Sequence, residues 1–446
     1  MSTALESFTD WIRATDTHAF YHVPLLERAE EMLQAGARVP QEERRKMAVA
    51  LERWRYQRLN TRKVAAAAQD QQLIEALDET ANALAGRAPR PARNPRAALQ
   101  DTNPTAAELA VVGCLDERLP LDDLARQATA LTQQHFGIVE PGQSPAVRRR
   151  MLMYAPLYLS SYCINHCTYC GFSFPLSIPR KHLTLDEALR QADILCGRGF
   201  RHILLVAGDF PSMTTTAYFV SVLRALSDQG ISPSIEIAPQ CTDSYAEMVA
   251  AGARGITLYQ ETFDEEVYAK IHLRGTKTSF DWRLEALERA AEAGMPRLGL
   301  GVLLGLAEPR ADFLALVRYA AYLQSRFPDR TLAFSLPRIH EGPAGYQIPH
   351  KVDEATFFRM YCALRVAFPK AELVLSTREA AELRDRLARV CITQISAGSS
   401  TTPGGYEVSK DEATGGEQFP ISDHRSPAEV FGWLREEGLA PVWDCR

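Results

Sequence analysis

Three closely spaced cysteines are the residues of this chain with the clearest capacity for chemistry. Cys163, Cys167 and Cys170 follow a Cys-x3-Cys-x2-Cys spacing in "CINHCTYC" (163–170), and no fourth cysteine lies nearby. Thiolates select zinc, copper(I) or iron–sulfur clusters. Three cysteines leave one iron of a cubane four-iron cluster open to a small molecule. The alternative is zinc with His166 as fourth ligand, but His166 directly precedes Cys167, which strains a tetrahedral site.

The elements that must position these thiols follow from the pattern after residue 150. Short apolar β-rich runs alternate there with amphipathic helical stretches, such as 184–199, which begins with a Thr184/Glu187 capping box, and 280–294, which ends at Gly294. Eight such units predict a parallel (β/α)8 TIM-type barrel, with an open doubly wound sheet as the alternative. The predicted strands are 156–161, 202–207, 234–239, 255–260, 298–304, 332–337, 372–377 and 392–396.

Polar residues follow most of these strands. Active sites of such barrels lie at the carboxyl ends of the strands, so we expect these residues to surround one site. They are Cys163, Gly208-Asp209, Pro239-Gln240, Gln260-Glu261-Thr262, Arg338, Ser376, Arg378 and Ser396.

Composition excludes several classes of protein. The 446 residues carry a net charge of −5, which is too small to indicate binding to nucleic acid or to an anionic membrane. The longest nearly apolar run, 298–307, is too short to span a bilayer, and the first residues lack the apolar core of a secretion signal. Of nine cysteines, six are scattered singly, which gives no disulfide framework, and the three clustered ones favour a reducing, cytoplasmic compartment. The single cysteines are Cys114, Cys196, Cys241, Cys362, Cys391 and Cys445.

The cysteine segment resembles the cluster motif of radical S-adenosylmethionine enzymes, in which an aromatic residue, here Tyr169, precedes the last cysteine. Further segments over about residues 105 to 446 resemble the aromatic-amino-acid lyases of that superfamily, and most closely the 2-iminoacetate synthases. The segments are "LYQETF" (258–263), "FDWRLEALERA" (280–290), "SLPRI" (335–339), "LSTRE" (375–379), "SAGSSTTPGGY" (396–406) and "EQFPISDHRSPAEV" (417–430).

The resemblance implies a 4Fe–4S cluster on the three cysteines and S-adenosylmethionine as cofactor. It implies that Gly208 and Asp209 receive the methionine amino group, and that Gln260 and Glu261 hold the ribose hydroxyls or the substrate. Arg283 would meet the S-adenosylmethionine carboxylate, although as a helical arginine beside acids it could equally be a surface residue; Gly301 would lie by the adenine. A planar guanidinium takes a carboxylate with two parallel bonds, so we expect Arg338 to bind the substrate carboxylate. Arg378 is the second candidate, supported by Ser376.

The reaction implied is radical cleavage of the Cα–Cβ bond of L-tyrosine to 4-cresol and dehydroglycine for thiazole and thiamine synthesis. A flavodoxin- or ferredoxin-type electron donor and a thiazole synthase are the partners implied. One alternative is the tyrosine lyase of diiron hydrogenase cofactor assembly, which needs a second cluster where this chain offers only Cys445. Others are a tryptophan lyase of the same group and, from another class, a non-catalytic iron–sulfur or zinc scaffold.

The expected organisation has five parts. Residues 1–86 form a helical region of unknown role, and 87–104 a Pro/Arg-rich extended linker. Residues 105–150 lead into a barrel at 151–400, and 401–446 are a family-specific segment that closes it.

Overall fold

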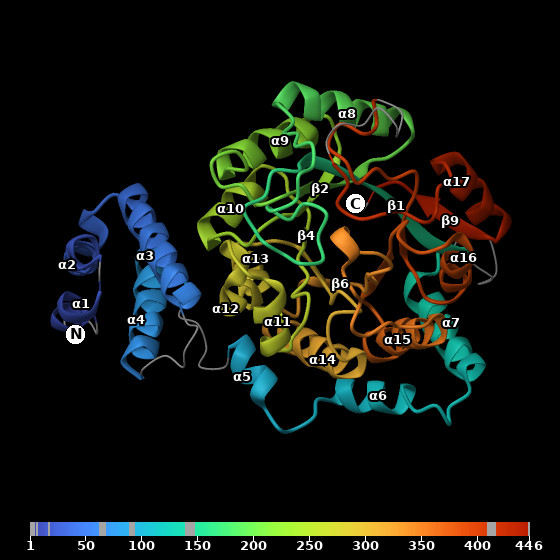
Figure 1. Cartoon of the computed structure of the whole chain (residues 1–446), viewed down its shortest axis with the longest axis horizontal. Helices are drawn as coiled ribbons and strands as arrows, with labels where there is room; N and C mark the ends of the chain where they lie inside the picture. Colours follow the sequence, from blue (N-terminus) through green and yellow to red (C-terminus); the bar gives the residue numbers. More distant parts are fainter. Residues whose placement is uncertain are drawn as a thin grey trace.

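A closed parallel barrel forms the larger part of the molecule (Figure 1). The computed structural model describes residues 5, 8–16, 18–61, 68–88, 94–138, 148–407 and 416–444. The strand order is β2-β3-β4-β5-β6-β7-β8-β1, and β1 also pairs with β2, so the sheet closes on itself and the open-sheet alternative is wrong. The strands are β1 (Arg149–Ser160), β2 (His202–Ala207), β3 (Ser232–Glu236), β4 (Ile256–Thr257), β5 (Arg297–Leu300), β6 (Thr331–Ser335), β7 (Glu372–Leu375) and β8 (Gln394–Ser396).

Helices cover the outside of this barrel, as the alternating sequence pattern predicts. The Thr184/Glu187 capping box is present at the start of α8. The helix expected over 280–294 is broken at Glu285 into two short helices. The covering helices are α6 (Ala106–Cys114), α7 (Leu121–Phe136), α8 (Leu185–Gly197), α9 (Thr216–Asp228), α10 (Thr242–Ala250), α11 (Glu265–Ile271), α12 (Phe280–Leu284), α13 (Ala286–Glu292), α14 (Pro309–Arg326), α15 (Glu354–Ala367), α16 (Ala381–Val390) and α17 (Pro427–Glu436), with 3-10 turns η3 (Thr276–Thr278) and η4 (Pro343–Gly345).

One strand lies outside the barrel and was not expected. β9 (Leu439–Val442) pairs in parallel with the first residues of β1, from Arg149↔Leu439 to Leu152↔Val442. The segment contains Pro441, which cannot donate to a ladder and is tolerated at a sheet edge. β1 begins at Arg149, seven residues before the predicted start at Pro156. Pro156 instead lies within the strand, opposite Leu204 of β2.

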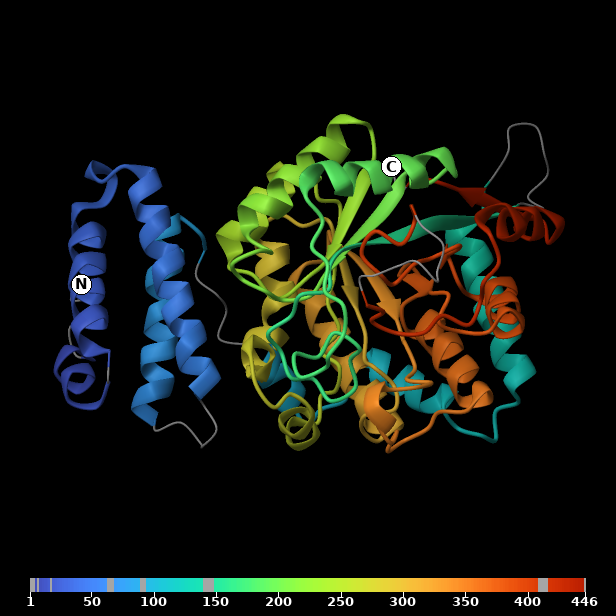
Figure 2. The same ribbon diagram turned by 45° about the horizontal axis from the view of Figure 1, so that its top comes forward.

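The N-terminal helices form a separate group that lies beside the barrel (Figures 1 and 2). It has its own apolar core, which includes Trp54 and Leu77. Arg55 joins it to the barrel through two bonds to the carboxylate of Glu285, with N–O distances of 2.6 and 2.8 Å. The helices are α1 (Thr9–Thr15), α2 (Ala19–Ala35), α3 (Gln41–Thr61) and α4 (Ala68–Ala85), with the 3-10 turn η2 (Gly36–Arg38).

The connection predicted as an extended linker contains a short helix, α5 (Pro95–Gln100). Asn94 accepts the backbone N–H of Ala97, and Pro95 occupies the first helical position, where its missing N–H costs nothing. Arg96 anchors this helix to the barrel through Asp281 and Glu265. A proline can begin a helix as well as occur in a linker, so the proline content of 87–104 did not reveal this helix.

In the described part of the chain, no helix combines the length and the apolar character needed to cross a membrane.

Candidate active site

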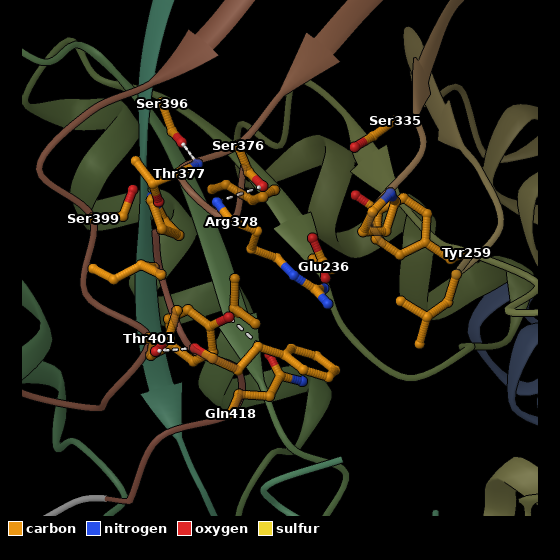
Figure 3. A pocket seen from close by; sticks show the side chains of 18 of the residues that line it. Glu236, Tyr259, Ser335, Ser376, Thr377, Arg378, Ser396, Ser399, Thr401 and Gln418 are labelled. Atoms are coloured by element: carbon orange, nitrogen blue, oxygen red, sulfur yellow. Dashed lines mark hydrogen bonds between the residues drawn. The ribbon is translucent and has the colours of Figure 1, made fainter. Parts of the chain in front are cut away.

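Most of the polar residues predicted at the carboxyl ends of the strands line two adjoining hollows. The outer one is a cleft that all three clustered cysteines line, together with Gly208 and Arg283. The inner one is a cavity within the barrel mouth, walled by aromatic and hydroxyl side chains and by Arg378 and Glu236 (Figure 3). Cys170, Glu236 and Glu261 line both. The two hollows therefore meet at these side chains.

The cysteine loop fits a cluster ligand set. All three thiols are free, and they line one cleft. N–H groups are directed at two of the sulfurs: Asn165 Nδ2 lies 3.7 Å from Cys163 Sγ, and the backbone nitrogen of Phe172 lies 3.4 Å from Cys170 Sγ. Burial raises the pKa of the Cys170 thiol to about 11, so a thiolate here needs bound cations such as iron.

The zinc alternative loses its proposed fourth ligand. The ring of His166 stacks on Phe174, with centroids 5.3 Å apart, and His166 is not among the residues that line the cleft. Within the described ranges, no three His, Cys, Asp or Glu side chains converge on a single ion position. In a cubane cluster each cysteine binds a different iron, so the three sulfurs need not meet at one ion position.

Gly208 and Asp209 both line the cleft. A side chain at Gly208 would place its Cβ 2.3 Å from the carbonyl oxygen of Tyr162, so only glycine allows this approach to the cysteine loop. The carboxylate of Asp209 accepts Asn165 Nδ2 at 3.1 Å and the hydroxyl of Thr276. Asp209 thus ties the cysteine loop to the turn at 276–278, and its carboxylate is already hydrogen-bonded within the protein.

Glu261 lies where the two hollows meet, in an unusual backbone conformation. Its φ of 75° is the only positive value for a non-glycine residue in the described chain. Such strain persists where surrounding contacts hold it, and it concentrates at functional sites. Lys277 Nζ and Arg283 bond to the same carboxylate oxygen, at 2.6 and 3.1 Å. Arg283 is therefore a buried residue of the cleft, which excludes the surface alternative.

Three other residues predicted to contact the cofactors do not line the cysteine cleft. Tyr169 lines the inner cavity, and its hydroxyl meets His272 Nε2 at 2.9 Å. Gln260 is buried with its amide directed at the carbonyl of Phe280 and does not line either hollow. At Gly301 a Cβ would lie 1.9 Å from the carbonyl oxygen of Ser335, so packing of β5 against β6 suffices to require glycine there. The roles expected for Gln260 and Gly301 stay predictions.

Arg338 does not face the cavity, contrary to the expectation that it binds the substrate carboxylate. Its guanidinium forms a two-bond ion pair with Glu379, donates to the carbonyl of Val352 at 2.8 Å and lies over the ring of Phe357. Burial raises the pKa of Glu379, but bonds from His340 and Arg338 outweigh burial and hold that pKa below its ordinary value. Arg338 is thus committed to a buried structural pair.

Replacing Arg338 by alanine should therefore destabilise the fold, because it removes the two-bond cationic partner of a charged Glu379 that is 3% exposed. Losing one partner of a buried pair costs about 3–5 kcal/mol. Thermal unfolding of Arg338→Ala beside Arg338→Ala/Glu379→Gln measures this, and the double variant should recover part of the loss. A stable Arg338→Ala protein that fails only to bind substrate would restore the original assignment.

Arg378 and Ser376 line the cavity as expected. The guanidinium of Arg378 lies over the ring of Phe419, 4.0 Å from its centroid, and donates to the carbonyl of Arg338 at 2.9 Å. No carboxylate in the described residues lies within ion-pair distance of it, and burial lowers its pKa despite the acidic groups nearby. A partly buried cation without a carboxylate partner favours an anionic ligand. Arg378 is consequently the residue best placed for a carboxylate.

Several residues of the site lacked a clear sequence signal. Lys277 lies on a 3-10 turn rather than at a strand end. Gln418 comes from the C-terminal segment and accepts the hydroxyl of Tyr158 at 2.7 Å. Glu236 is an acid within the apolar strand "SIEIAP" (234–239), and that interruption was the available signal. Phe419 and Ile421 show that the C-terminal segment also covers the cavity.

Comparisons with known proteins agree with this geometry. Residues 157–320 match the Radical SAM superfamily, and residues 335–440 match the Biotin and Thiamin Synthesis associated domain. The 2-iminoacetate synthase of Escherichia coli is 39% identical over 326 residues, which cover 72% of this chain and 82% of that protein. The 2-iminoacetate synthase of Salmonella typhimurium is 36% identical over 324 residues, which again cover 72% of this chain and 82% of that protein.

Among solved structures, the FeFe-hydrogenase maturase HydG from Carboxydothermus hydrogenoformans is similar, with a TM-score of 0.65 and 28% identity. The likeness covers 94% of this chain and 84% of HydG. Residues 105–446 alone could not supply that share, so the structural likeness extends into the N-terminal helices, which the sequence resemblance leaves out.

The barrel, the cysteine cleft and the matched superfamily define a radical S-adenosylmethionine enzyme that uses a 4Fe–4S cluster. Within that class, the chain belongs to the 2-iminoacetate synthase family of carbon–carbon lyases.

Proposed function

We propose that this chain cleaves the Cα–Cβ bond of L-tyrosine and releases 4-cresol and 2-iminoacetate, that is dehydroglycine, for thiazole and thiamine synthesis. The observation that carries the proposal is the aromatic-walled cavity that contains Arg378 and adjoins the cysteine cleft. The relatives at 36–39% identity carry the name of that activity. A tyrosine-sized molecule needs one anchor for its carboxylate, apolar walls for its ring and access to the cofactor side.

The cofactors would occupy the outer cleft. Cys163, Cys167 and Cys170 would hold the cluster, and Gly208 and Arg283 would border S-adenosylmethionine. Once bound, these groups supply the 5′-deoxyadenosyl radical. The protein's part is to bind, orient and exclude water around the reacting atoms.

The side chains of the inner cavity would orient tyrosine. Arg378 takes the carboxylate, and the hydroxyls of Ser376 and Ser396 stand on neighbouring strand ends for further hydrogen bonds (Figure 3). Tyr158, Tyr259 and Phe419 supply walls for the aromatic ring. Pairing of Glu261 with Lys277 and Arg283 removes one acid from competition for the substrate.

The partners follow from the chemistry. The cluster needs a low-potential one-electron donor of the flavodoxin or ferredoxin type. Dehydroglycine is an imine that water hydrolyses, so direct uptake by a thiazole synthase would protect the product. A reducing cytoplasmic compartment suits the three free cluster thiols.

An anaerobic assay with tyrosine and, separately, tryptophan tests the substrate. We expect 4-cresol from tyrosine and no cleavage of tryptophan beyond background. Formation of 3-methylindole-2-carboxylate from tryptophan, with no cresol from tyrosine, would move the enzyme to the tryptophan branch.

A second candidate is the hydrogenase-cofactor branch, which the likeness to HydG favours. Both the thiazole branch and the hydrogenase-cofactor branch would form dehydroglycine from tyrosine. They differ in whether dehydroglycine is released or broken down further. Cys445, the cysteine nearest the C-terminus, lies outside the described residues.

A further inference from the structure

Glu236 is a partly buried carboxylate of the cavity that the expected roles leave unused. Two acids, Glu236 and Glu261, line the cavity. The carboxylate of Glu261 is already paired with Lys277 and Arg283. Among the described residues, no hydrogen bond or ion pair reaches the carboxylate of Glu236, and its side chain points into the cavity (Figure 3). A carboxylate partly withdrawn from water without a hydrogen-bond partner favours a ligand that supplies one.

The position of Glu236 restricts which part of a ligand it meets. It stands at the end of β3, while Arg378 follows β7, and the strand order places these two strands on opposite sides of the barrel. Both side chains reach into the same cavity. An α-amino acid carries its cationic and anionic groups on one carbon, so a ligand between them would direct its carboxylate to Arg378 and its amino group to Glu236.

Glu236 also borders the cofactor cleft. The group of the substrate that loses a hydrogen atom must lie where the two hollows meet. The resemblance to the aromatic-amino-acid lyases implies that this group is the α-amino group, whereas the phenol lies at the far end of the molecule. The amino group is therefore the better match for this carboxylate.

We propose that Glu236 binds the α-amino group of the substrate and, as a base, takes one proton from its ammonium form. This inference rests on the proposed tyrosine lyase function. The N–H bond of the ammonium breaks, its electron pair stays on nitrogen, and the proton passes to a carboxylate oxygen of Glu236. The neutral amine then keeps a lone pair beside the Cα–Cβ bond that breaks. No electron is gained or lost in this step.

The charges around Glu236 suit a base near neutral pH. Burial raises its pKa to about 7, Glu261 adds to the rise, and Arg378, Arg283 and Lys277 oppose it. Tyr154, Tyr158 and Tyr259 line the same cavity, and the charge of Glu236 contributes to their raised pKa values. A base acts when ionised, so kcat/KM for tyrosine should rise as the pH increases through this pKa. Glu236→Gln should lack that rise.

The direct test compares ligands with and without an amino group. Equilibrium dialysis, with S-adenosylmethionine present and the cluster oxidised to prevent turnover, gives the Kd of tyrosine and of 3-(4-hydroxyphenyl)propanoate. The wild-type protein should prefer tyrosine by about ten- to a hundred-fold, the range of one charge-assisted hydrogen bond. In Glu236→Gln the preference should fall nearly to one. Glu341→Gln, which changes an exposed carboxylate outside the cavity, should keep it.

Other outcomes overturn the proposal. An unchanged preference in Glu236→Gln would show that the carboxylate does not bind the amine. Loss of the preference for tyrosine over phenylalanine instead would assign Glu236 to the phenol. S-adenosylmethionine affinity reports whether the variant folds; if it does not, Glu236→Asp decides, since its shorter reach should reduce the amine preference. Wild-type protein that shows the amine preference but forms no cresol would defeat the lyase function and leave this inference standing.

Discussion

Alanine in place of Cys163, Cys167 or Cys170 should abolish the brown iron–sulfur absorbance and all formation of 5′-deoxyadenosine. Each of the three thiols lines the same cleft, and each would hold a different iron. Soft thiolate ligands are what an iron–sulfur cluster requires, and alanine offers no replacement. Anaerobic reconstitution followed by iron analysis and product quantification measures both losses.

Cys196→Ala is the matched control for the cluster variants. Cys196 is a single, partly buried cysteine on α8, away from the cleft, and its loss should leave iron content and 5′-deoxyadenosine formation unchanged. Full iron content in a Cys167→Ala protein would contradict the assignment of the cluster to this loop.

Arg378→Ala should weaken tyrosine binding by roughly thirty- to several-thousand-fold. The estimate takes about 2–5 kcal/mol for truncating one partner of a buried charge pair, at about 1.4 kcal/mol per decade. Arg378 lines the cavity and has no carboxylate partner within ion-pair distance among the described residues. S-adenosylmethionine binding and slow uncoupled cleavage of it should survive, because the guanidinium lies outside the cysteine cleft.

Two further variants sharpen this result. Arg378→Lys keeps the charge but loses the planar two-bond geometry, so an intermediate affinity is expected. Arg386→Ala removes an exposed arginine of α16 and should change nothing. Unaltered tyrosine affinity in Arg378→Ala would show that the carboxylate binds elsewhere in the cavity.

The sequence predicted the barrel and the location of its site because both depend on local patterns. Apolar runs, capping residues and the cysteine spacing are legible over a few residues. The positions of strand starts were less accurate: Pro156 suggested the beginning of β1 but lies inside it. α5 and β9 were missed because their prolines are equally typical of linkers.

The choice between Arg338 and Arg378 illustrates what sequence could not decide. Both arginines follow barrel strands, and either could have reached the cavity. The deciding contact is the ion pair of Arg338 with Glu379, 41 residues along the chain. Lys277 was missed for a similar reason, since its bond to Glu261 depends on how the turn at 276–278 folds back over the strand ends.

The central claim is that tyrosine is cleaved and that dehydroglycine leaves intact. The most direct measurement is a single anaerobic reaction with dithionite, S-adenosylmethionine and tyrosine labelled with carbon-13 at Cα and the carboxylate, with haemoglobin present to trap carbon monoxide. The account predicts 4-cresol and labelled glyoxylate, the hydrolysis product of dehydroglycine, in about equal amounts, with neither carbon monoxide nor cyanide. Labelled carbon monoxide in amounts near the cresol, or no cresol at all, would contradict it.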